Sequence, residues 1–294
     1  MTTLREATDE ATVPLAHETG RQADDPVTPT DGPAPVGADD GLAPSGPSDE
    51  SPMNGGTRSR DGNPVPPPAV AAMFDEIAPV YDRMNTLMTM GLDGRWRRAA
   101  VSAAHLSPGD AVIDVACGTG KLAAALAERV GPFGRVLAID LAAGMIDEAV
   151  RQNRDLVQLQ FAVGDALALP AHDGEFDAAT ISFGLRNLPD FEAGFREMAR
   201  VVRSGGWVVC LELSLPRPRP LGRVYHSVFR RFAPLLGRAF RRKAAYQYLP
   251  ASLDGFPNPD ELSQTMIRAG LVEVSYRRLA VGAVALHRGR VPTG

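Results

Sequence analysis

The chain has 294 residues and a formal net charge of −4 at pH 7. It holds no run of 18 apolar residues, and its N-terminus lacks a basic region followed by an apolar one, so we expect neither a membrane-spanning helix nor a signal peptide. Its two cysteines, Cys117 and Cys210, lack the spacing of a metal site or a disulfide framework, so we expect a cytoplasmic protein without a bound metal.

Residues 1–68 differ in composition from the rest of the chain. They hold 12 acidic residues against 4 arginines, contain no aromatic residue, and are rich in Pro, Gly, Ser, Thr and Asp. Such a segment cannot bury enough apolar surface to offset the entropy lost on ordering. We therefore predict a disordered acidic tail over 1–68 and one folded domain over 69–294.

The domain is predicted to begin with helices over 69–106 and then to alternate between strands and helices. The first helical stretch, 69–90, is split in two by Pro79, and a further helix covers 94–105. The alternating part is predicted as strand 111–116, helix 120–130, strand 134–139, helix 142–153, strands 157–163 and 175–183, helix 190–202 and strand 206–214.

Gly205 and Gly206 are expected to form the turn that leads into the strand over 206–214. The last predicted elements are a helix over 259–269 and an antiparallel hairpin of strands 271–279 and 283–287. Continuous β-branched runs separated by helices predict an α/β fold with a mostly parallel sheet covered on both faces and the hairpin at its edge.

A glycine turn follows the first predicted strand of the sheet. The strand ends in Asp114, and Cys117-Gly118-Thr119-Gly120 leads into the next helix. A dinucleotide-binding turn needs a third glycine where Ala123 stands, and a phosphate-binding loop needs a glycine at position 115 and a hydroxyl residue at 122. The pattern from Asp114 to Gly120 is instead that of S-adenosylmethionine-dependent methyltransferases, in which Asp114 or nearby carbonyls meet the ammonium of the methionine part.

Polar residues follow the next strands, where ligands bind to parallel sheets. Asp140 ends the second strand and is predicted to accept hydrogen bonds from both ribose hydroxyls of a nucleoside. Asp165 and Ala166 follow the third strand and are candidates to hold an adenine ring. After the fourth strand, Arg186 and Asn187 offer donors to an oxygen-bearing ring, although a solvated loop arginine is an equal alternative.

Four stretches resemble the ubiquinone/menaquinone biosynthesis C-methyltransferase family over about 73–290. They are 73–85 continuing to Gly91 and Trp96, Ser182 to Asn187, 200–214, and 246–250 with Phe256-Pro257 and 284–289. Several positions depart from the family pattern. Two of these changes are conservative for the fold: Arg203-Ser204 stands in place of Lys-Pro before the two glycines, and Glu212-Leu213-Ser214-Leu215-Pro216 stands in place of Glu-Phe-Ser-Lys-Pro. Asp93 stands where the family usually has His, and Lys121 stands where Asp is common.

The resemblance implies a class I, Rossmann-like methyltransferase fold with a seven-stranded sheet, and methyl transfer from S-adenosylmethionine to a ring carbon of a reduced quinone. It implies catalytic roles for Arg186, Asn187, Tyr81 and Asn85, with Asp82 also able to position or relay a proton. The implied co-substrate contacts are Asp114, Gly118, Thr119, Gly120, Asp140, Asp165, Ala166 and Ser182.

The acceptor expected from the menaquinone branch of the family is a polyprenylated demethylnaphthoquinol. Three alternatives stay open. They are a benzoquinol of ubiquinone biosynthesis, another phenolic metabolite, and a module that binds S-adenosylmethionine without turnover. The residues do not distinguish the two quinols, and they leave a homodimer open.

A basic amphipathic insertion is predicted over 217–250. Nine basic residues and no acid lie within 217–243, interleaved with apolar and aromatic residues. This composition suits an anionic membrane surface and would place the enzyme at the inner face of the membrane. A solvated surface is the alternative, and we do not expect nucleic acid as a partner because no recognised module accompanies the charge.

Overall fold

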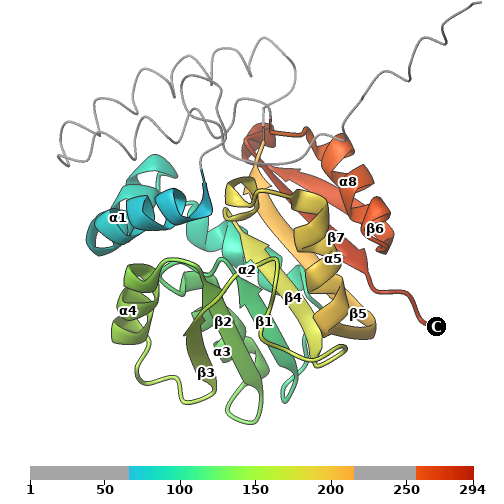
Figure 1. The fold of residues 1–294 in the computed structure, drawn as a ribbon, viewed down its shortest axis with the longest axis horizontal. Coiled ribbons are helices and arrows are strands. Elements are labelled where there is room, and N and C mark those ends of the chain that lie inside the picture. The colour runs from blue at the N-terminus through green and yellow to red at the C-terminus, as the bar shows by residue number, and fades with distance from the viewer. Residues whose placement is uncertain (1–65, 215–255) are drawn as a thin grey trace, which may run out of the picture. The chain divides into compact units, whose positions relative to one another are not determined.

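The computed structural model describes residues 66–214 and 256–294, which form one mixed sheet flanked by helices (Figure 1). The helices before the sheet are α1 (Pro67–Met88) and α2 (Asp93–Ala103). Along the chain, the next elements are β1 (Ala111–Val115), α3 (Lys121–Val130), β2 (Arg135–Asp140), α4 (Ala143–Gln152) and β3 (Leu159–Val163). They are followed by β4 (Phe176–Ser182), α5 (Phe191–Val201), β5 (Val202–Leu213), α8 (Pro259–Arg268), β6 (Val272–Leu279) and β7 (Val284–Arg290).

The strand order is β3-β2-β1-β4-β5-β7-β6. The first five strands are parallel, and β7 is antiparallel to both β5 and β6. The predicted mostly parallel sheet with a C-terminal antiparallel hairpin is therefore confirmed. Within the hairpin, β7 pairs with β5 and leaves β6 at the edge.

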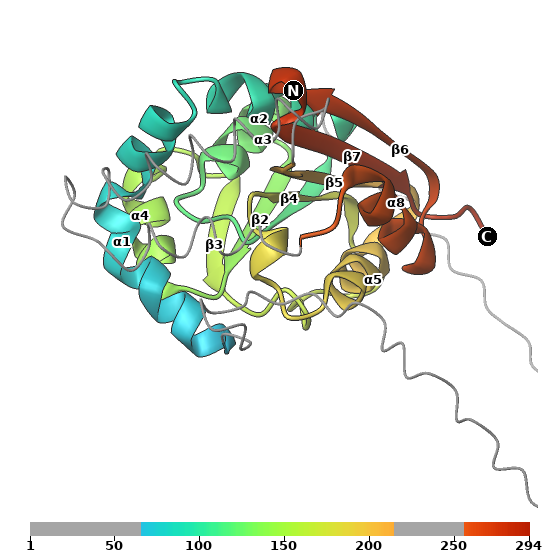
Figure 2. The ribbon, with the colours of Figure 1, turned by 90° about the horizontal axis from the view of Figure 1, so that it is seen from above.

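Alternate side chains of the central strands supply the cores on the two faces of the sheet. Ile113 and Ile181 pack with α5 and α8 on one face, while Val112 and Val209 pack with α2 and α3 on the other. Figure 2 shows these helix pairs on opposite sides of the sheet. Since both faces are covered, the strands read in the sequence as nearly continuous apolar runs.

Helix α1 is continuous through Pro79, so the predicted break into two helices was wrong. A proline inside a helix removes one hydrogen bond and costs about 3 kcal/mol. Ile77 and Ala78, directly before Pro79, are buried in a cluster that includes Ala142 and Met145 of the α4 region. Burial of this apolar face offsets the local cost. The helix also begins at Pro67, within the predicted tail.

Strand β5 begins at Val202, directly after α5, so Gly205 and Gly206 lie inside a strand and not in a turn before it. The pairing with β4 is irregular here, because Phe176 pairs with Val202 whereas Ala178 pairs with Trp207. The extra residues bulge outward, and Gly205 takes the left-handed φ of +77° that such a bulge requires.

Two predicted segments lie outside the described residues. They are the acidic tail up to residue 65 and the basic insertion over 217–250, together with its membrane contact at 217–243. Among the helices that the structure describes, none is long and apolar enough to cross a membrane.

Candidate functional site

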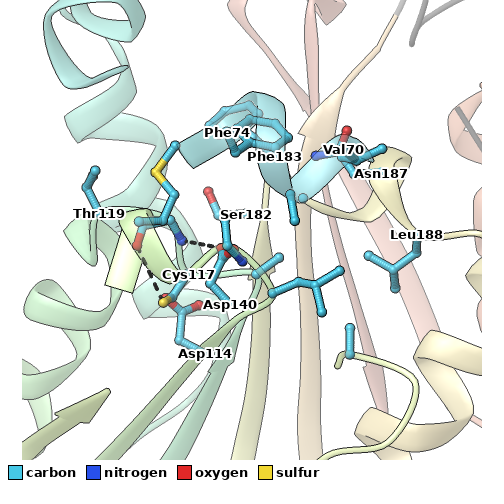
Figure 3. A pocket seen from close by; sticks show the side chains of 18 of the residues that line it. Val70, Phe74, Asp114, Cys117, Thr119, Asp140, Ser182, Phe183, Asn187 and Leu188 are labelled. Carbon is cyan, nitrogen blue, oxygen red and sulfur yellow. Dashed lines mark hydrogen bonds between the residues drawn. The ribbon is translucent and has the colours of Figure 1, made fainter. Parts of the chain in front are cut away.

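A cleft lies at the carboxyl ends of the parallel strands and is covered by α1 (Figure 3). Its empty volume is about 1060 Å³, including the part that opens to solvent, which suffices for a nucleoside-bearing ligand and an aromatic acceptor. Figure 3 shows Asp114 and Asp140 on the sheet side of the cleft and Phe74 on the opposite side. The two acids therefore face an apolar side chain of α1 across the cleft.

The glycine turn after β1 is tied to the end of β2. The backbone N–H of Gly118 donates to Asp140 Oδ2 at 2.8 Å, and that of Ala142 donates to Oδ1 at 2.9 Å. Each carboxylate oxygen keeps a lone pair for a further donor, as two ribose hydroxyls require. Gly120 has a φ of +80°, and a Cβ there would come within 2.8 Å of the Phe161 ring, so this position requires glycine. Burial raises the pKa of Asp140.

Asp114 is a buried carboxyl group that is only partly satisfied. Thr180 Oγ1 donates to its Oδ1 at 2.6 Å, whereas Oδ2 has no hydrogen-bond partner within the described part of the chain. Burial raises the pKa of Asp114 to about 7, against the hydrogen bond from Thr180 that favours the ionised form. An acid of this kind suits a cationic ligand group, because the cation would supply the missing partner.

Two carboxylates tie α1 to the nucleoside side of the cleft. Asp82 accepts from Thr119 Oγ1 at 2.7 Å and lies 3.4 Å from Lys121 Nζ, so it joins the helix to the glycine turn. Asp75 accepts from the backbone N–H of Gly144 at 2.7 Å. Helix α1 therefore forms a wall of the cleft that is anchored at two points.

The cleft brings most of the predicted site residues together. Those that line it are Tyr81, Asp114, Gly118, Thr119, Asp140, Asp165, Ala166, Ser182 and Asn187. Among the described residues that line the cleft, neither Asn85 nor Arg186 is found, and Gly120 shapes the turn from behind. The roles assigned to these residues stay predictions.

Arg186 lies in the wall behind the cleft. Its Nη1 donates to Glu212 Oε1 at 2.7 Å and to the carbonyl oxygen of Phe183 at 2.6 Å, and both charged side chains are almost fully buried, with 4% and 1% exposed. The neighbouring Asn187 lines the cleft. Leu185–Asn187 forms a 3₁₀ turn, in which successive side chains point about 120° apart, so Arg186 and Asn187 face different surroundings.

Several lining residues were not identified from the sequence. Val70 and Phe74 of α1 repeat with Ile77 and with the predicted Tyr81 at helical spacing, a pattern that could have indicated the apolar wall. Arg97 reaches the cleft from α2 and forms an ion pair with Asp93. Cys117 also lines the cleft, but burial raises the pKa of its thiol, which disfavours the reactive thiolate. Among the residues that the structure describes, no cluster could hold a metal ion.

Comparison with known proteins identifies close relatives of the chain. The model of the ubiE/COQ5 methyltransferase family matches residues 63–291. A demethylmenaquinone methyltransferase of Desulfitobacterium hafniense (strain Y51) is 42% identical over 226 residues, which cover 74% of this chain and 88% of that protein. A protein of the same name from Roseiflexus castenholzii is 44% identical, with 77% and 97% covered, and one from Thermus thermophilus is 42% identical, with 75% and 100% covered.

Solved structures share the fold at low identity. A SAM-dependent methyltransferase from Aquifex aeolicus superposes with a TM-score of 0.50 at 15% identity, covering 66% of this chain and 89% of that one. The [4+2]-cyclase SpnF superposes with a TM-score of 0.57 at 16% identity, covering 82% and 99%. Because the second protein is named for a different reaction, these likenesses bear on the fold alone.

Proposed function

Since the chain belongs to the ubiE/COQ5 methyltransferase family, we propose that it transfers a methyl group from S-adenosylmethionine to a ring carbon of a demethylmenaquinol, giving menaquinol. The family membership confirms the resemblance seen in the motifs. The observation that carries the proposal is the cleft itself, which joins a row of acids at successive strand ends to an apolar wall. The curated relatives are named for the naphthoquinol reaction, which favours that acceptor over a benzoquinol.

The cleft fits S-adenosylmethionine as co-substrate. Asp165 and Ala166 at the end of β3 would hold the adenine, and Asp140 at the end of β2 would accept from the ribose hydroxyls. The unpartnered Oδ2 of Asp114 at the end of β1 would take the ammonium of the methionine part. Because β3, β2 and β1 are neighbours in the sheet, these three groups follow the length of one extended ligand.

The acceptor is a poor nucleophile until a ring hydroxyl loses its proton, because only then does charge spread onto the adjacent ring carbon. The residues that face the cleft from the acceptor side are Asn187, Tyr81 and the apolar Phe74, Phe183 and Leu188. The Asn187 amide and the Tyr81 hydroxyl are the groups we assign to holding the ring oxygens. The apolar side chains exclude water, which strengthens those contacts.

Arg186 is a positioning residue in this proposal. Its guanidinium joins the carbonyl of Phe183 to Glu212 at the end of β5, and so fixes the loop that presents Asn187. Because the Arg186 guanidinium is buried in its ion pair with Glu212, the structure does not support the predicted direct contact between Arg186 and the ring oxyanion. Asn85 is likewise given no contact with the acceptor.

The acceptor's polyprenyl tail needs an apolar path out of the cleft. Pro67, Val70 and Ala71 of α1 and Leu188 and Pro189 supply apolar lining suited to such a tail. The tail itself resides in a bilayer, and we assign contact with anionic lipid to the basic stretch 217–243 on its composition.

The direct test supplies the full chain with S-adenosylmethionine labelled in the methyl group and with reduced demethylmenaquinone or the corresponding benzoquinol in separate reactions. We expect label on a ring carbon of the naphthoquinol, identified by mass spectrometry. Label on the benzoquinol alone would instead assign the enzyme to ubiquinone biosynthesis. Binding of S-adenosylhomocysteine with label on neither quinol would overturn the assignment of the acceptor.

A further inference from the structure

A largely buried cation, Arg97, lines the cleft from α2. Arg97 of α2 has a side chain that is only 11% exposed, and its Nη1 forms an ion pair with Asp93 Oδ2. Asp93 is itself buried and accepts from Thr89 Oγ1 at 3.2 Å, which holds the pair in place. A guanidinium offers five N–H donors, and within the described residues only one of those of Arg97 is engaged. The group is therefore fixed and has donors for a ligand.

The other charges of the cleft indicate which ligand group would meet Arg97. Asp140 and Asp165 lie on the β2 and β3 side, and the second lining cation, Lys121, is paired with Asp82. Helix α2 packs on α3, the helix that follows the glycine turn, and on β5. Arg97 therefore approaches from the β1–β4 side, where its positive charge acts on Asp114.

A ligand that carries both an anionic and a cationic group would match the charges of Arg97 and Asp114. The unpartnered Oδ2 of Asp114 is suited to an ammonium, and the donors of Arg97 are suited to a carboxylate. An α-amino acid carries both groups on one carbon. We propose that Arg97, held by Asp93, binds the carboxylate of the methionine part of the co-substrate, and so forms with Asp114 a clamp for that amino acid group. This inference rests on the proposed binding of S-adenosylmethionine in the cleft.

The test compares two ligands that differ only in the carboxylate. S-adenosylhomocysteine carries it, and its decarboxylated analogue keeps the ammonium and lacks it. Calorimetry would be done at pH 8 on the full chain, on Arg97→Gln and Arg97→Lys, and on Arg98→Ala as a matched control, because Arg98 is exposed on the same helix and does not line the cleft. Arg97→Gln keeps a donor for Asp93, and circular dichroism checks its fold.

We expect Arg97→Gln to lower the affinity for S-adenosylhomocysteine by about ten- to a hundredfold, the usual effect of losing one charged hydrogen-bond partner. The same variant should not lose affinity for the decarboxylated analogue, and Arg97→Lys should recover part of the loss. Equal losses for both ligands, or no loss for either, would overturn the inference. A parent chain that binds neither ligand would instead refute the proposed co-substrate, so the two failures are distinguishable.

Discussion

Replacing Asp114 with Asn should change both the stability of the free enzyme and its affinity for the co-substrate, in opposite senses. The substitution keeps an oxygen that accepts from Thr180 and removes the ionisable group. The free enzyme loses a buried charge whose Oδ2 lacks a partner within the described residues. The ligand loses the carboxylate that would meet its ammonium.

The magnitude follows from the pKa of Asp114, which burial raises from 3.8 to about 7. The native state therefore binds the proton more tightly than the unfolded chain, and its stability falls as pH rises between these two values. The stability lost through this pKa difference is roughly 4 kcal/mol in total. Of this, about 3 kcal/mol is lost between pH 5 and pH 8, because Asp114 of the unfolded chain is already ionised at pH 5.

Denaturant unfolding of the ligand-free parent and of Asp114→Asn at these two pH values measures the difference. We expect the parent to lose about 3 kcal/mol more than the variant on going from pH 5 to pH 8. Calorimetry should show that the parent binds S-adenosylhomocysteine more weakly as pH falls below 7, whereas the variant binds weakly with a smaller pH dependence. Identical pH slopes of stability in the two proteins would refute the assignment of the raised pKa to Asp114.

Arg186→Met should lower the free energy of unfolding by about 3–5 kcal/mol, because the buried Glu212 carboxylate loses its cationic partner, and adding Glu212→Gln should recover part of this loss. An unchanged melting temperature together with a loss of turnover would instead indicate a catalytic role for Arg186. Asp82→Ala should speed amide hydrogen exchange in α1 by releasing it from the glycine turn, and unchanged exchange would show that this anchor is unimportant. Deleting residues 1–62 should leave turnover and melting temperature nearly unchanged, and a large loss of either would show that the acidic tail contributes to the folded enzyme.

The strands were predictable because burial on both faces imposes apolar, β-branched runs that few other structures need. Local signals failed where packing opposed them. Pro79 normally interrupts a helix, but its neighbours Ile77 and Ala78 are buried. Gly205 and Gly206 normally end an element, but here they absorb a bulge in β5.

The acids of the site were predictable from their place at the ends of successive strands. The orientation of Arg186 was not, because it depends on a 3₁₀ turn and on Glu212, which is 26 residues away and comes close only because β4 and β5 are neighbours. The place of Arg97 in the cleft was not predicted for the same reason. Nothing in the sequence near Asp93 and Arg97 shows that α2 brings this pair to the cleft.

The anchoring of α1 has a kinetic consequence. Both of its anchors, Asp75 to the N-terminus of α4 and Asp82 to the glycine turn, lie on elements that shape the nucleoside site. The same helix supplies Phe74 and Val70 to the acceptor side. A nucleoside that orders the glycine turn and α4 therefore also orders the surface that receives the quinol. We expect compulsory-order kinetics, in which S-adenosylmethionine binds first, the methylated quinol leaves before S-adenosylhomocysteine, and the latter inhibits competitively against S-adenosylmethionine alone.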